Sequence, residues 1–404
     1  MTSSPSITIR PHAGQLATIN ATQPYVAAIA GTGGGKTVSG EAWVLKQLAL
    51  HPGEPGLIAE PTWPMVDRIL MTNSPGRPSL LTLLRRLDQN AIYIKADRTI
   101  HTIYGTIFLA SATHPESMEG AHVRWAWLDE AGMMSYLAFE TACRRTSLKS
   151  GQVLVTTTPY NRGWLYRNIY QKWQHSDPDY HVTRYSSMAN PNYPKDVFER
   201  NRASMTPQRF AMMHEGNFER PEAMIHSNWD DKHLIDPFPL PHEWWQGAGI
   251  DFGFNHPTAA VWAARDDDGV YYMHQEYRKS QALLAGHHAT LTTMSGNGSN
   301  PQIWYADPAA KQSIAELRRL GMPMVPANND VANGNDTVGT LIATGRLKVF
   351  KGLTHWIDEV ESYSYELKDG QATDKPIKLN DDLMDATRYL LHTAEKQRGL
   401  FLHT

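Results

Sequence analysis

The chain has 404 residues, a mass of 45.4 kDa and a formal net charge of −3 at pH 7. This length exceeds what one hydrophobic core usually holds, so it predicts two domains. The single cysteine, Cys143, excludes a disulfide framework and a cysteine-rich zinc site and is typical of a reducing compartment. No apolar run approaches the ~18 residues of a membrane helix and the N-terminus lacks a signal-peptide core, so we expect no membrane association. The slightly negative charge leaves any DNA binding to local basic patches.

The first half alternates short apolar runs with helical patterns, which indicates a layered α/β fold. The strands expected there are apolar at most positions, as strands covered on both faces should be, and comprise residues 25–30, 56–60, 123–128 and 152–157. Three shorter runs predict a small antiparallel insertion, at residues 91–95, 99–103 and 106–110. Residues 195–218 have a polar helical pattern that Pro207 interrupts.

A compositional break separates the two halves. Four prolines fall between Arg220 and Trp245 and the segment has little periodicity, which predicts a linker over residues 220–245. The elements expected after it are strands at 247–254, 258–265, 269–278 and 303–307 and helices at 281–294, 309–320 and 381–396. We therefore predict two domains, of residues 1–219 and 246–404.

A glycine-rich loop, AGTGGGKT at residues 30–37, lies between the first predicted strand and a helix that continues to Leu50. In such a strand–loop–helix unit, backbone N–H groups and the helix N-terminus bind phosphate oxygens. Lys36 would reach the β- and γ-phosphates of a nucleotide, and the Thr37 hydroxyl would hold Mg²⁺. The phosphate-binding glycines would be Gly31, Gly33, Gly34 and Gly35. Ala30 replaces the first glycine of the usual pattern, and a glycine-rich turn with an exposed lysine is the alternative interpretation.

A second signal is an apolar strand that ends in two acids, WAWLDE at residues 125–130. A carboxylate at the C-terminal end of a strand in an open α/β sheet lies in the ligand crevice. We therefore expect Asp129 in the Mg²⁺ shell and expect Glu130 to orient and activate the attacking water. The alternative is a solvated acidic helix start. Together with the glycine-rich loop, the acidic pair predicts that a nucleotide is hydrolysed.

Two further features bear on hydrolysis. Threonines 156–158 end a neighbouring predicted strand, and their hydroxyls would sense the γ-phosphate through a water, although threonine-rich strands are common. Arg144 and Arg145 precede that strand and are candidates for an arginine finger, in cis or in trans. A solvated basic helix face is the alternative reading of the two arginines.

Single aspartates interrupt apolar patterns in the second half of the chain. Asp251 lies in the predicted strand GIDFGF and Asp307 ends WYAD, and a lone carboxylate facing a core is costly unless it is paired or binds metal. Asp382 and Asp385 are three residues apart at the start of the last helix, so they share one face. This order of acids is that of an RNase H-like nuclease, whose site holds two divalent ions. Carboxylate oxygens favour Mg²⁺ or Mn²⁺.

Several other titratable residues have two interpretations. Glu276 would point into the same acidic site or be an exposed edge residue. Asp381 would serve as the N-cap of the last helix, where a carboxylate satisfies free N–H groups. His242 and the neighbours His287 and His288 show no zinc-like spacing, so we expect no role for them in metal binding.

Over nearly the whole chain these motifs resemble one family, the large terminase subunit of tailed double-stranded DNA bacteriophages. The first half resembles its packaging ATPase in the segments AGTGGGKT, AEPTW, PESMEGAHVRWAWLDEAG and VLVTTTPYNRG. The second half resembles its nuclease in GIDFGFNHPTAAVW, WYADPAAKQSI and NDDLMDATRYLL. The resemblance implies an α/β fold with an N-terminal P-loop ATPase domain of the RecA/ASCE type and a C-terminal RNase H-like nuclease domain.

The resemblance also implies roles for individual residues of the first half. Glu130 would be the catalytic glutamate, threonines 156–158 the coupling motif, and Gln15 would take the place of a glutamine that contacts adenine. Many members carry an arginine inside the phosphate loop where this chain has Thr32. The identity of the catalytic arginine is therefore open.

In the second half the family often has a histidine before the paired acids of the last helix, where this chain has Asn380. The third metal ligand beside Asp251 and Asp307 is therefore left open between Asp382 and Asp385.

By the same resemblance, the ATPase translocates double-stranded DNA into a preformed capsid, and the nuclease cuts concatemeric DNA at the start and end of packaging. A homo-oligomeric ring of subunits would dock on the portal protein in the host cytoplasm, and a small terminase subunit would choose the DNA. ATP and Mg²⁺ are the implied cofactors, with Mn²⁺ as an option at the nuclease. The residues alone support an Mg²⁺-dependent NTPase joined to a metal-dependent phosphodiesterase.

Three other functions fit parts of this pattern. A helicase or repair ATPase with a fused nuclease is the nearest, but only 90 residues separate the acidic pair from residue 220, too few for a second RecA-like domain. An adaptor protein whose nucleotide site is only structural would bind ATP without hydrolysing it. An integrase-like transposase core in the second half would join strands to a target DNA.

Overall fold

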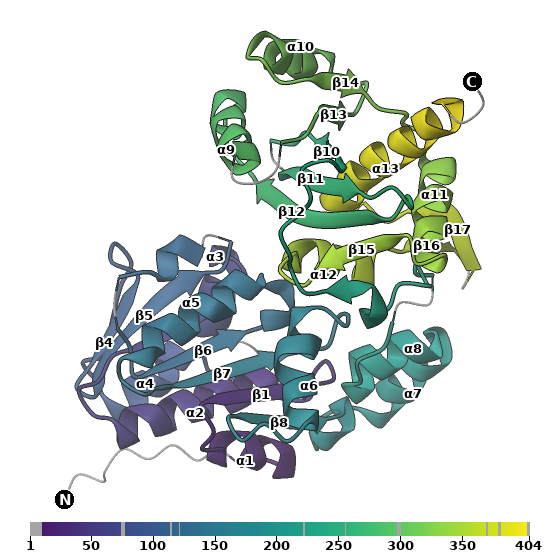
Figure 1. Ribbon diagram of the computed structural model, residues 1–404. Helices are drawn as coiled ribbons and strands as arrows, with labels where there is room; N and C mark the ends of the chain where they lie inside the picture. Colours follow the sequence, from purple (N-terminus) through teal and green to yellow (C-terminus); the bar gives the residue numbers. More distant parts are fainter. Residues whose placement is uncertain are drawn as a thin grey trace, which may run out of the picture. The chain divides into compact units, whose positions relative to one another are not determined.

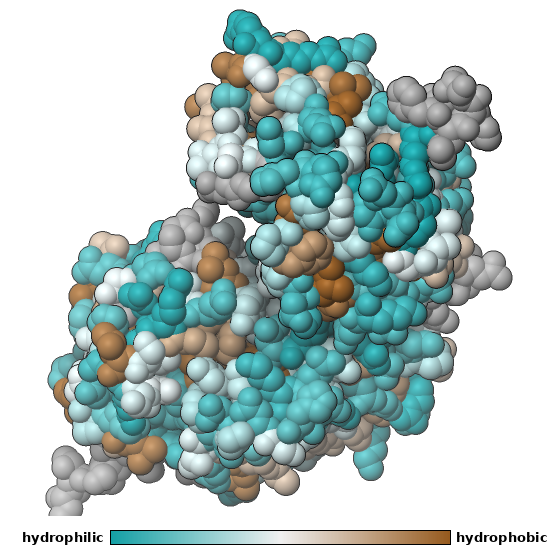
Figure 2. Space-filling view, viewed as in Figure 1, coloured by the Kyte–Doolittle hydropathy of each residue, from teal (hydrophilic) through white to brown (hydrophobic). Residues whose placement is uncertain are grey.

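A computed structural model describes residues 10–73, 77–113, 115–120, 122–220, 223–254, 256–296, 300–368, 371–378 and 381–401. The chain forms two compact units, Met1–Arg220 and Pro221–Thr404, and each is described by itself. In the view of Figure 2 the surface is mainly hydrophilic, with hydrophobic residues scattered between hydrophilic ones. Among the described residues, no helix is both long and apolar enough to cross a membrane.

The first unit is built on an eight-stranded sheet in the order β3-β4-β5-β2-β6-β7-β1-β8 (Figure 1). Its strands are β1 (Tyr25–Ala30), β2 (Gly56–Glu60), β3 (Ile92–Ile94), β4 (Thr99–Thr102), β5 (Gly105–Ser111), β6 (Trp125–Asp129), β7 (Gln152–Thr157) and β8 (Tyr180–Tyr185). The strands from β5 to β8 in this order are parallel, and β3 and β4 extend the sheet in antiparallel pairing. The expected small insertion is therefore part of the main sheet, because β5 also pairs with β2.

Helices cover both faces of this sheet. The α-helices of this unit are α1 (Ala13–Asn20), α2 (Lys36–Leu50), α3 (Trp63–Met65), α4 (Leu80–Leu87), α5 (Tyr136–Ser147), α6 (Gln171–Gln174), α7 (Lys195–Ser204) and α8 (Pro207–Phe210), of which α7 and α8 pack on each other. Buried residues of α2 and α4 share one hydrophobic cluster with the sheet, and those of α5 share another. Because both faces are covered, the central strands are apolar at almost every position. Their apolar runs are the reason that the sequence predicts them.

The second unit is built on a seven-stranded sheet in the order β14-β13-β10-β11-β12-β15-β9 (Figure 1). These strands are β9 (Leu234–Ile235), β10 (Trp245–Asp251), β11 (Thr258–Arg265), β12 (Tyr271–Lys279), β13 (Ile303–Ala306), β14 (Met324–Pro326) and β15 (Leu347–Phe350), with a separate hairpin of β16 (Tyr365–Lys368) and β17 (Gln371–Pro376). The hairpin-connected β10, β11 and β12 are antiparallel, whereas β13 lies parallel to β10. Parallel pairing puts the C-terminal ends of β10 and β13 side by side.

Five helices complete the described part of the second unit: α9 (Leu284–Gly296), α10 (Lys311–Arg319), α11 (Val331–Ala343), α12 (Thr354–Ser362) and α13 (Asp382–Phe401). The large cluster on one sheet face includes α11, α12 and α13, and the smaller cluster on the other face includes α9 and α10. In the segment expected as a linker, Trp229 is fully buried in the large cluster and β9 pairs with β15. Residues 223–245 thus contribute to the core of the second unit.

Candidate nucleotide and metal sites

The glycine-rich loop follows β1 and precedes α2, as the motif predicts. Lys36 is 6% exposed, and its Nζ lies 2.8 Å from the Thr158 Oγ1 and 4.0 Å from a Glu130 carboxylate oxygen. Burial lowers the pKa of Lys36, and the carboxylates of Glu130 and Asp129 oppose that shift. A buried ammonium at the end of a glycine-rich loop suits the binding of a negatively charged phosphate group.

Side chains from outside the loop hold its carbonyl groups. Gln15 donates from Nε2 to the Gly35 carbonyl at 2.9 Å, and Asn190 donates to the Gly33 carbonyl at 2.7 Å. A Cβ atom on Gly31 would lie 2.3 Å from the His214 carbonyl oxygen, so only glycine fits there. Gln15 thus contacts the loop backbone, and its expected contact with adenine stays a prediction.

Asp129 lies at the end of β6 and is fully buried. Its two carboxylate oxygens accept hydrogen bonds from the Thr37 Oγ1 at 3.0 Å and from the Thr156 Oγ1 at 2.5 Å. Burial and the neighbouring Glu130 raise the pKa of Asp129 to about 6. The Thr37–Asp129 pair has the oxygen donors that Mg²⁺ prefers, so these residues fit the ion expected with a nucleotide.

Glu130 follows the last residue of β6 and has the left-handed backbone conformation, with φ 50°, so the chain leaves the strand direction at this residue. Its Oε2 accepts a hydrogen bond from the Tyr160 hydroxyl at 3.2 Å, and its Oε1 faces Lys36. The position of Tyr160 after β7 was not singled out by the sequence, because a tyrosine 30 residues from the acid carries no local signal. Tyr160 fixes the direction in which the Glu130 carboxylate points.

Arg144 and Arg145 lie in the last turn of α5 and both form ion pairs with Glu119, at 2.8 and 2.7 Å. The Arg145 carbonyl accepts a hydrogen bond from the backbone N–H of Val123, just before β6. Asp129 is at the other end of that strand, about 20 Å away at ~3.3 Å per residue. The structure therefore does not bring either arginine to the phosphate loop of its own chain, and a role in trans stays a prediction.

Two buried glutamates that the motifs do not predict, Glu60 and Glu41, lie near Asp129. Glu60 ends β2, is fully buried, and has no hydrogen-bond partner for either carboxylate oxygen among the described residues. Burial raises its pKa well above the usual value, and Asp129 and Glu130 add to the shift. Glu41 on α2 is 1% exposed and pairs with Arg77 at 3.3 Å. Two buried glutamates outside the motifs therefore lie close enough to Asp129 for its charge to raise their pKa.

The second site gathers the four aspartates expected to bind metal. Asp251 ends β10 and Asp307 follows β13, so their positions are set by parallel pairing of the two strands. Asp382 and Asp385 lie in the first turn of α13, each 8% exposed, whereas Asn380 lies outside the described residues. Burial raises the pKa of Asp251 to about 8, and Asp385, Asp382 and Asp307 add to the shift in that order. Carboxylates whose charges act on one another in this way fit a divalent cation.

A glycine allows the last helix to reach this strand. A Cβ atom on Gly249 of β10 would lie 2.1 Å from the backbone carbonyl oxygen of Ala386 in α13. The close approach places Asp385, one residue earlier in the helix, against Asp251 at the end of the strand.

Gly249→Ala should therefore destabilise the second unit, by about 1–3 kcal/mol, because the added methyl group must push α13 from the sheet. Thermal unfolding followed by circular dichroism measures this loss. The matched control is Gly286→Ala in α9, where a Cβ meets nothing within 4 Å and the helix gains propensity. Equal melting temperatures for Gly249→Ala and the wild type would contradict the described packing.

Cations and an imidazole already contact the two helix aspartates. Asp385 pairs with Arg388 at 2.8 Å and with Lys378 at 2.7 Å. Asp382 pairs with Arg278 at 3.3 Å, and one of its oxygens lies 3.0 Å from the His256 Nδ1. The sequence does not predict Lys378, Arg278 and His256 as partners, because they lie outside the helix that carries the two acids. Arg388 lies in the same helix, three residues after Asp385.

Glu276 and Glu359 hold helix N-termini near the site. Glu276 accepts hydrogen bonds from the backbone N–H groups of His355 and Trp356, at 3.0 and 2.7 Å, at the start of α12. Its carboxylate therefore caps a helix instead of joining the aspartates. Glu359, 2% exposed, accepts from the N–H of Leu383 at 2.8 Å and so fixes the start of α13. Asp381 directly precedes α13, and its carbonyl accepts a hydrogen bond from the N–H of Asp385 at 2.9 Å, while its side chain pairs with Lys378 at 2.9 Å.

Comparison with known proteins matches both halves of the chain to one family. A family model described as terminase large subunit, T4likevirus-type, N-terminal, matches residues 29–229, and one described as terminase RNaseH-like domain matches residues 248–394. The large terminase subunit of Enterobacteria phage LP7 is 28% identical over 168 residues, which cover 38% of this chain and 34% of the relative. For the large terminase subunit of Salmonella phage P22 the identity is also 28%, with coverages of 38% and 32%. The chain thus matches about a third of the length of these curated relatives.

Solved structures with some likeness to this chain carry the same description. The large terminase from a thermophilic bacteriophage is 19% identical, with a TM-score of 0.46 over 95% of this chain and 99% of that chain. The nuclease domain of the P22 large terminase is 23% identical, with a TM-score of 0.38 over 43% of this chain and 93% of that chain.

Proposed function

This chain belongs to the large terminase subunits of phages, and on that premise we propose that it is a viral DNA-packaging motor with a built-in nuclease. ATP hydrolysis in the first unit drives double-stranded DNA into a procapsid, and the second unit cuts concatemeric DNA to begin and end packaging. The observation that carries this proposal is the presence of two chemically distinct sites, one around Lys36 and Glu130 and one around Asp251, in separate compact units.

In the ATPase site, the proposal gives each residue one task. Lys36 binds the β- and γ-phosphates, whose negative charge matches that of its buried ammonium. Thr37 and Asp129 hold Mg²⁺, which neutralises charge on the phosphate oxygens when it is bound. Glu130, oriented by Tyr160, positions the attacking water and accepts its proton.

Tyr160→Phe should lower the rate of ATP hydrolysis about 5- to 10-fold, because it removes one hydrogen bond of ~1–1.5 kcal/mol that orients Glu130. The measurement is steady-state phosphate release at saturating ATP. Tyr93→Phe, on the edge strand β3 of the same unit, is the matched control and should keep the wild-type rate. An unchanged rate for Tyr160→Phe would show that Glu130 needs no such support.

In the nuclease site, Asp251, Asp307, Asp382 and Asp385 provide the carboxylate oxygens for two divalent ions. Such ions supply an activated water and stabilise the leaving 3′ oxygen of a phosphodiester when they are bound. Asp251 is central among these four residues, because the charges of the other three each raise its pKa. Glu359 and Arg278 hold the start of α13 and thereby the direction of Asp382.

We assign the ATPase to the first unit, where residues 1–219 were expected to hold it, and the nuclease to the second unit, which also includes the residues before 246 that were expected to form a linker. The partners proposed from the family are the portal protein, a small terminase subunit that chooses the DNA, and further copies of this chain in a ring on the portal. The place of action is then the host cytoplasm, during transient docking on the procapsid. An arginine finger from a neighbouring subunit fits such a ring, and Arg144 and Arg145 are the candidates.

A helicase with a fused nuclease is the rival function, and one pair of assays separates the two. Procapsids of the same virus, with the purified chain and ATP, should protect linear double-stranded DNA from added DNase, and Lys36→Ala should abolish that protection. Forked duplex DNA without procapsids should stay double-stranded. Unwinding of the fork that depends on Lys36, without protection, would overturn the packaging proposal in favour of the rival.

A further inference from the structure

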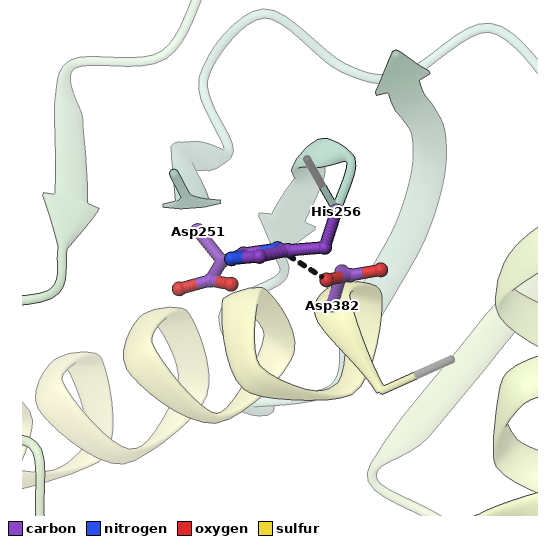
Figure 3. A group of neighbouring side chains, drawn as sticks. All are labelled: Asp251, His256 and Asp382. Atoms are coloured by element: carbon purple, nitrogen blue, oxygen red, sulfur yellow. Dashed lines mark hydrogen bonds and ion pairs between the residues drawn. The ribbon is translucent and has the colours of Figure 1, made fainter. Parts of the chain in front are cut away.

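A histidine lies inside the aspartate cluster, between two of its carboxylates (Figure 3). One ligand atom each from His256, Asp251 and Asp382 can be chosen so that all three lie within 4.8 Å of one another. The His256 Nδ1 is 3.0 Å from an oxygen of Asp382. Two ligands on opposite sides of one ion are separated by ~4–5 Å, so the three side chains have the span of a single coordination sphere.

The loop that carries the histidine has a shape that brings its ring to the site. A Cβ atom on Gly253 would lie 2.4 Å from the His256 Nδ1, so the ring occupies space that only a glycine leaves free. Thr258 closes the loop, because its hydroxyl donates to the Gly253 carbonyl at 2.7 Å and accepts from the Gly253 N–H at 3.1 Å. The space beside Gly253 thus admits the ring, and the hydrogen bond to Asp382 orients its Nδ1 toward the carboxylates.

The two sides of Asp251 differ in charge. Toward Asp385, the cations Lys378 and Arg388 already neutralise the carboxylate. Asp382 has fewer cationic partners. Apart from His256, Arg278 is the one basic side chain within ion-pair distance of it among the described residues, at 3.3 Å. The His256 side chain is 60% exposed, so a cation can reach it from solvent.

We propose that His256 is a nitrogen ligand of one of the two divalent ions, which it holds together with Asp251 and Asp382. This inference rests on the proposed nuclease function and adds a ligand that the aspartate motif does not contain. Because imidazole nitrogen binds Mn²⁺ better than it binds Mg²⁺, the ion on this side should be bound with a preference for Mn²⁺. The ion on the side of Asp307 and Asp385 would be held there by carboxylate oxygens.

The test uses the full chain and Mn²⁺ as the probe. Electron spin-echo modulation of bound Mn²⁺ reports directly coordinated ¹⁴N, and a titration followed by electron paramagnetic resonance gives the affinities. We expect ¹⁴N modulation in the wild type and its loss in His256→Asn, with one of two Mn²⁺ ions bound about 10- to 100-fold more weakly. Mg²⁺ affinity, measured by competition, should change less. His288→Asn, on α9, is the matched control and should keep the modulation.

Three outcomes would overturn the inference. Wild-type protein that binds Mn²⁺ and cleaves DNA without ¹⁴N modulation would show that His256 is only an ion-pair partner of Asp382, while the nuclease function stands. Retained modulation in both His256→Asn and His256→Ala would assign the nitrogen to another residue. Wild-type protein that neither binds Mn²⁺ nor cleaves DNA would remove the nuclease function together with the inference. Melting curves without metal check that both variants fold.

Discussion

Glu130→Gln should retain ATP binding and lose hydrolysis by about 10²- to 10⁴-fold, the range for removal of a general base. Glutamine keeps the size of the side chain and an oxygen for the Tyr160 hydroxyl, but it cannot take a proton from the attacking water. The buried Lys36 and the Thr37–Asp129 pair remain to bind the nucleotide. Phosphate release measures the hydrolysis, and a fluorescent ATP analogue measures the binding.

Glu140→Gln is the matched control for this substitution, because Glu140 is an exposed glutamate of α5 in the same unit. It should hydrolyse ATP at the wild-type rate. Hydrolysis by Glu130→Gln at a rate close to the wild type would remove Glu130 from the chemistry. Loss of ATP binding in that variant would mean that the carboxylate is needed for the structure of the site.

Asp251→Asn should abolish DNA cleavage, by at least about 10²-fold, and leave ATP hydrolysis unchanged, because the charges of the other three aspartates all act on Asp251. The measurement is the conversion of supercoiled plasmid to open-circular and linear forms in Mg²⁺ or Mn²⁺. Asp336→Asn, an exposed aspartate of α11 in the same unit, is the matched control. Plasmid cleavage by Asp251→Asn at the wild-type rate would place the metal elsewhere.

The same substitution should raise the melting temperature without metal, and the rise should grow with pH. Burial and three neighbouring aspartates raise the pKa of Asp251 to about 8, so the folded state disfavours its charged form. In the wild type, ionisation of Asp251 therefore lowers the free energy of unfolding. This loss is absent below the ordinary aspartate pKa near 4, grows as the pH rises, and is complete above about 8. Melting in EDTA at pH 5 and pH 8 checks this, and an equal shift at both pH values would contradict it.

Much of the first unit could be predicted because its strands are covered on both faces. The ranges of β1, β2 and β7 follow directly from apolar runs, and the acids at the end of β6 mark the crevice. The strand β8 was missed because it is polar at several positions and lies at the edge of the sheet. A run of apolar residues marks a strand that is buried on both faces, and the edge strand β8 is only partly buried.

The residues that support each site could not be predicted, because they act across long stretches of chain. Tyr160 contacts an acid 30 residues earlier, and Glu359 holds a helix that begins 23 residues later. His256 reaches Asp382 from another element. The prolines before Trp245 indicated a linker, whereas the fold buries Trp229 in the second core. Prolines in that segment predict an irregular backbone, but they do not show which side chains pack into a core.

The central claim is that one chain carries two independent catalytic sites, and plasmid cleavage by three proteins tests it most directly. Wild type, Asp251→Ala and Lys36→Ala are compared in Mg²⁺ and in Mn²⁺, with ATP hydrolysis measured on the same samples. We expect Asp251→Ala to lose cleavage and keep hydrolysis, and Lys36→Ala to lose hydrolysis and keep cleavage. Loss of both activities in either variant, or an intact plasmid with the wild type in both metals, would contradict two separate sites in this chain.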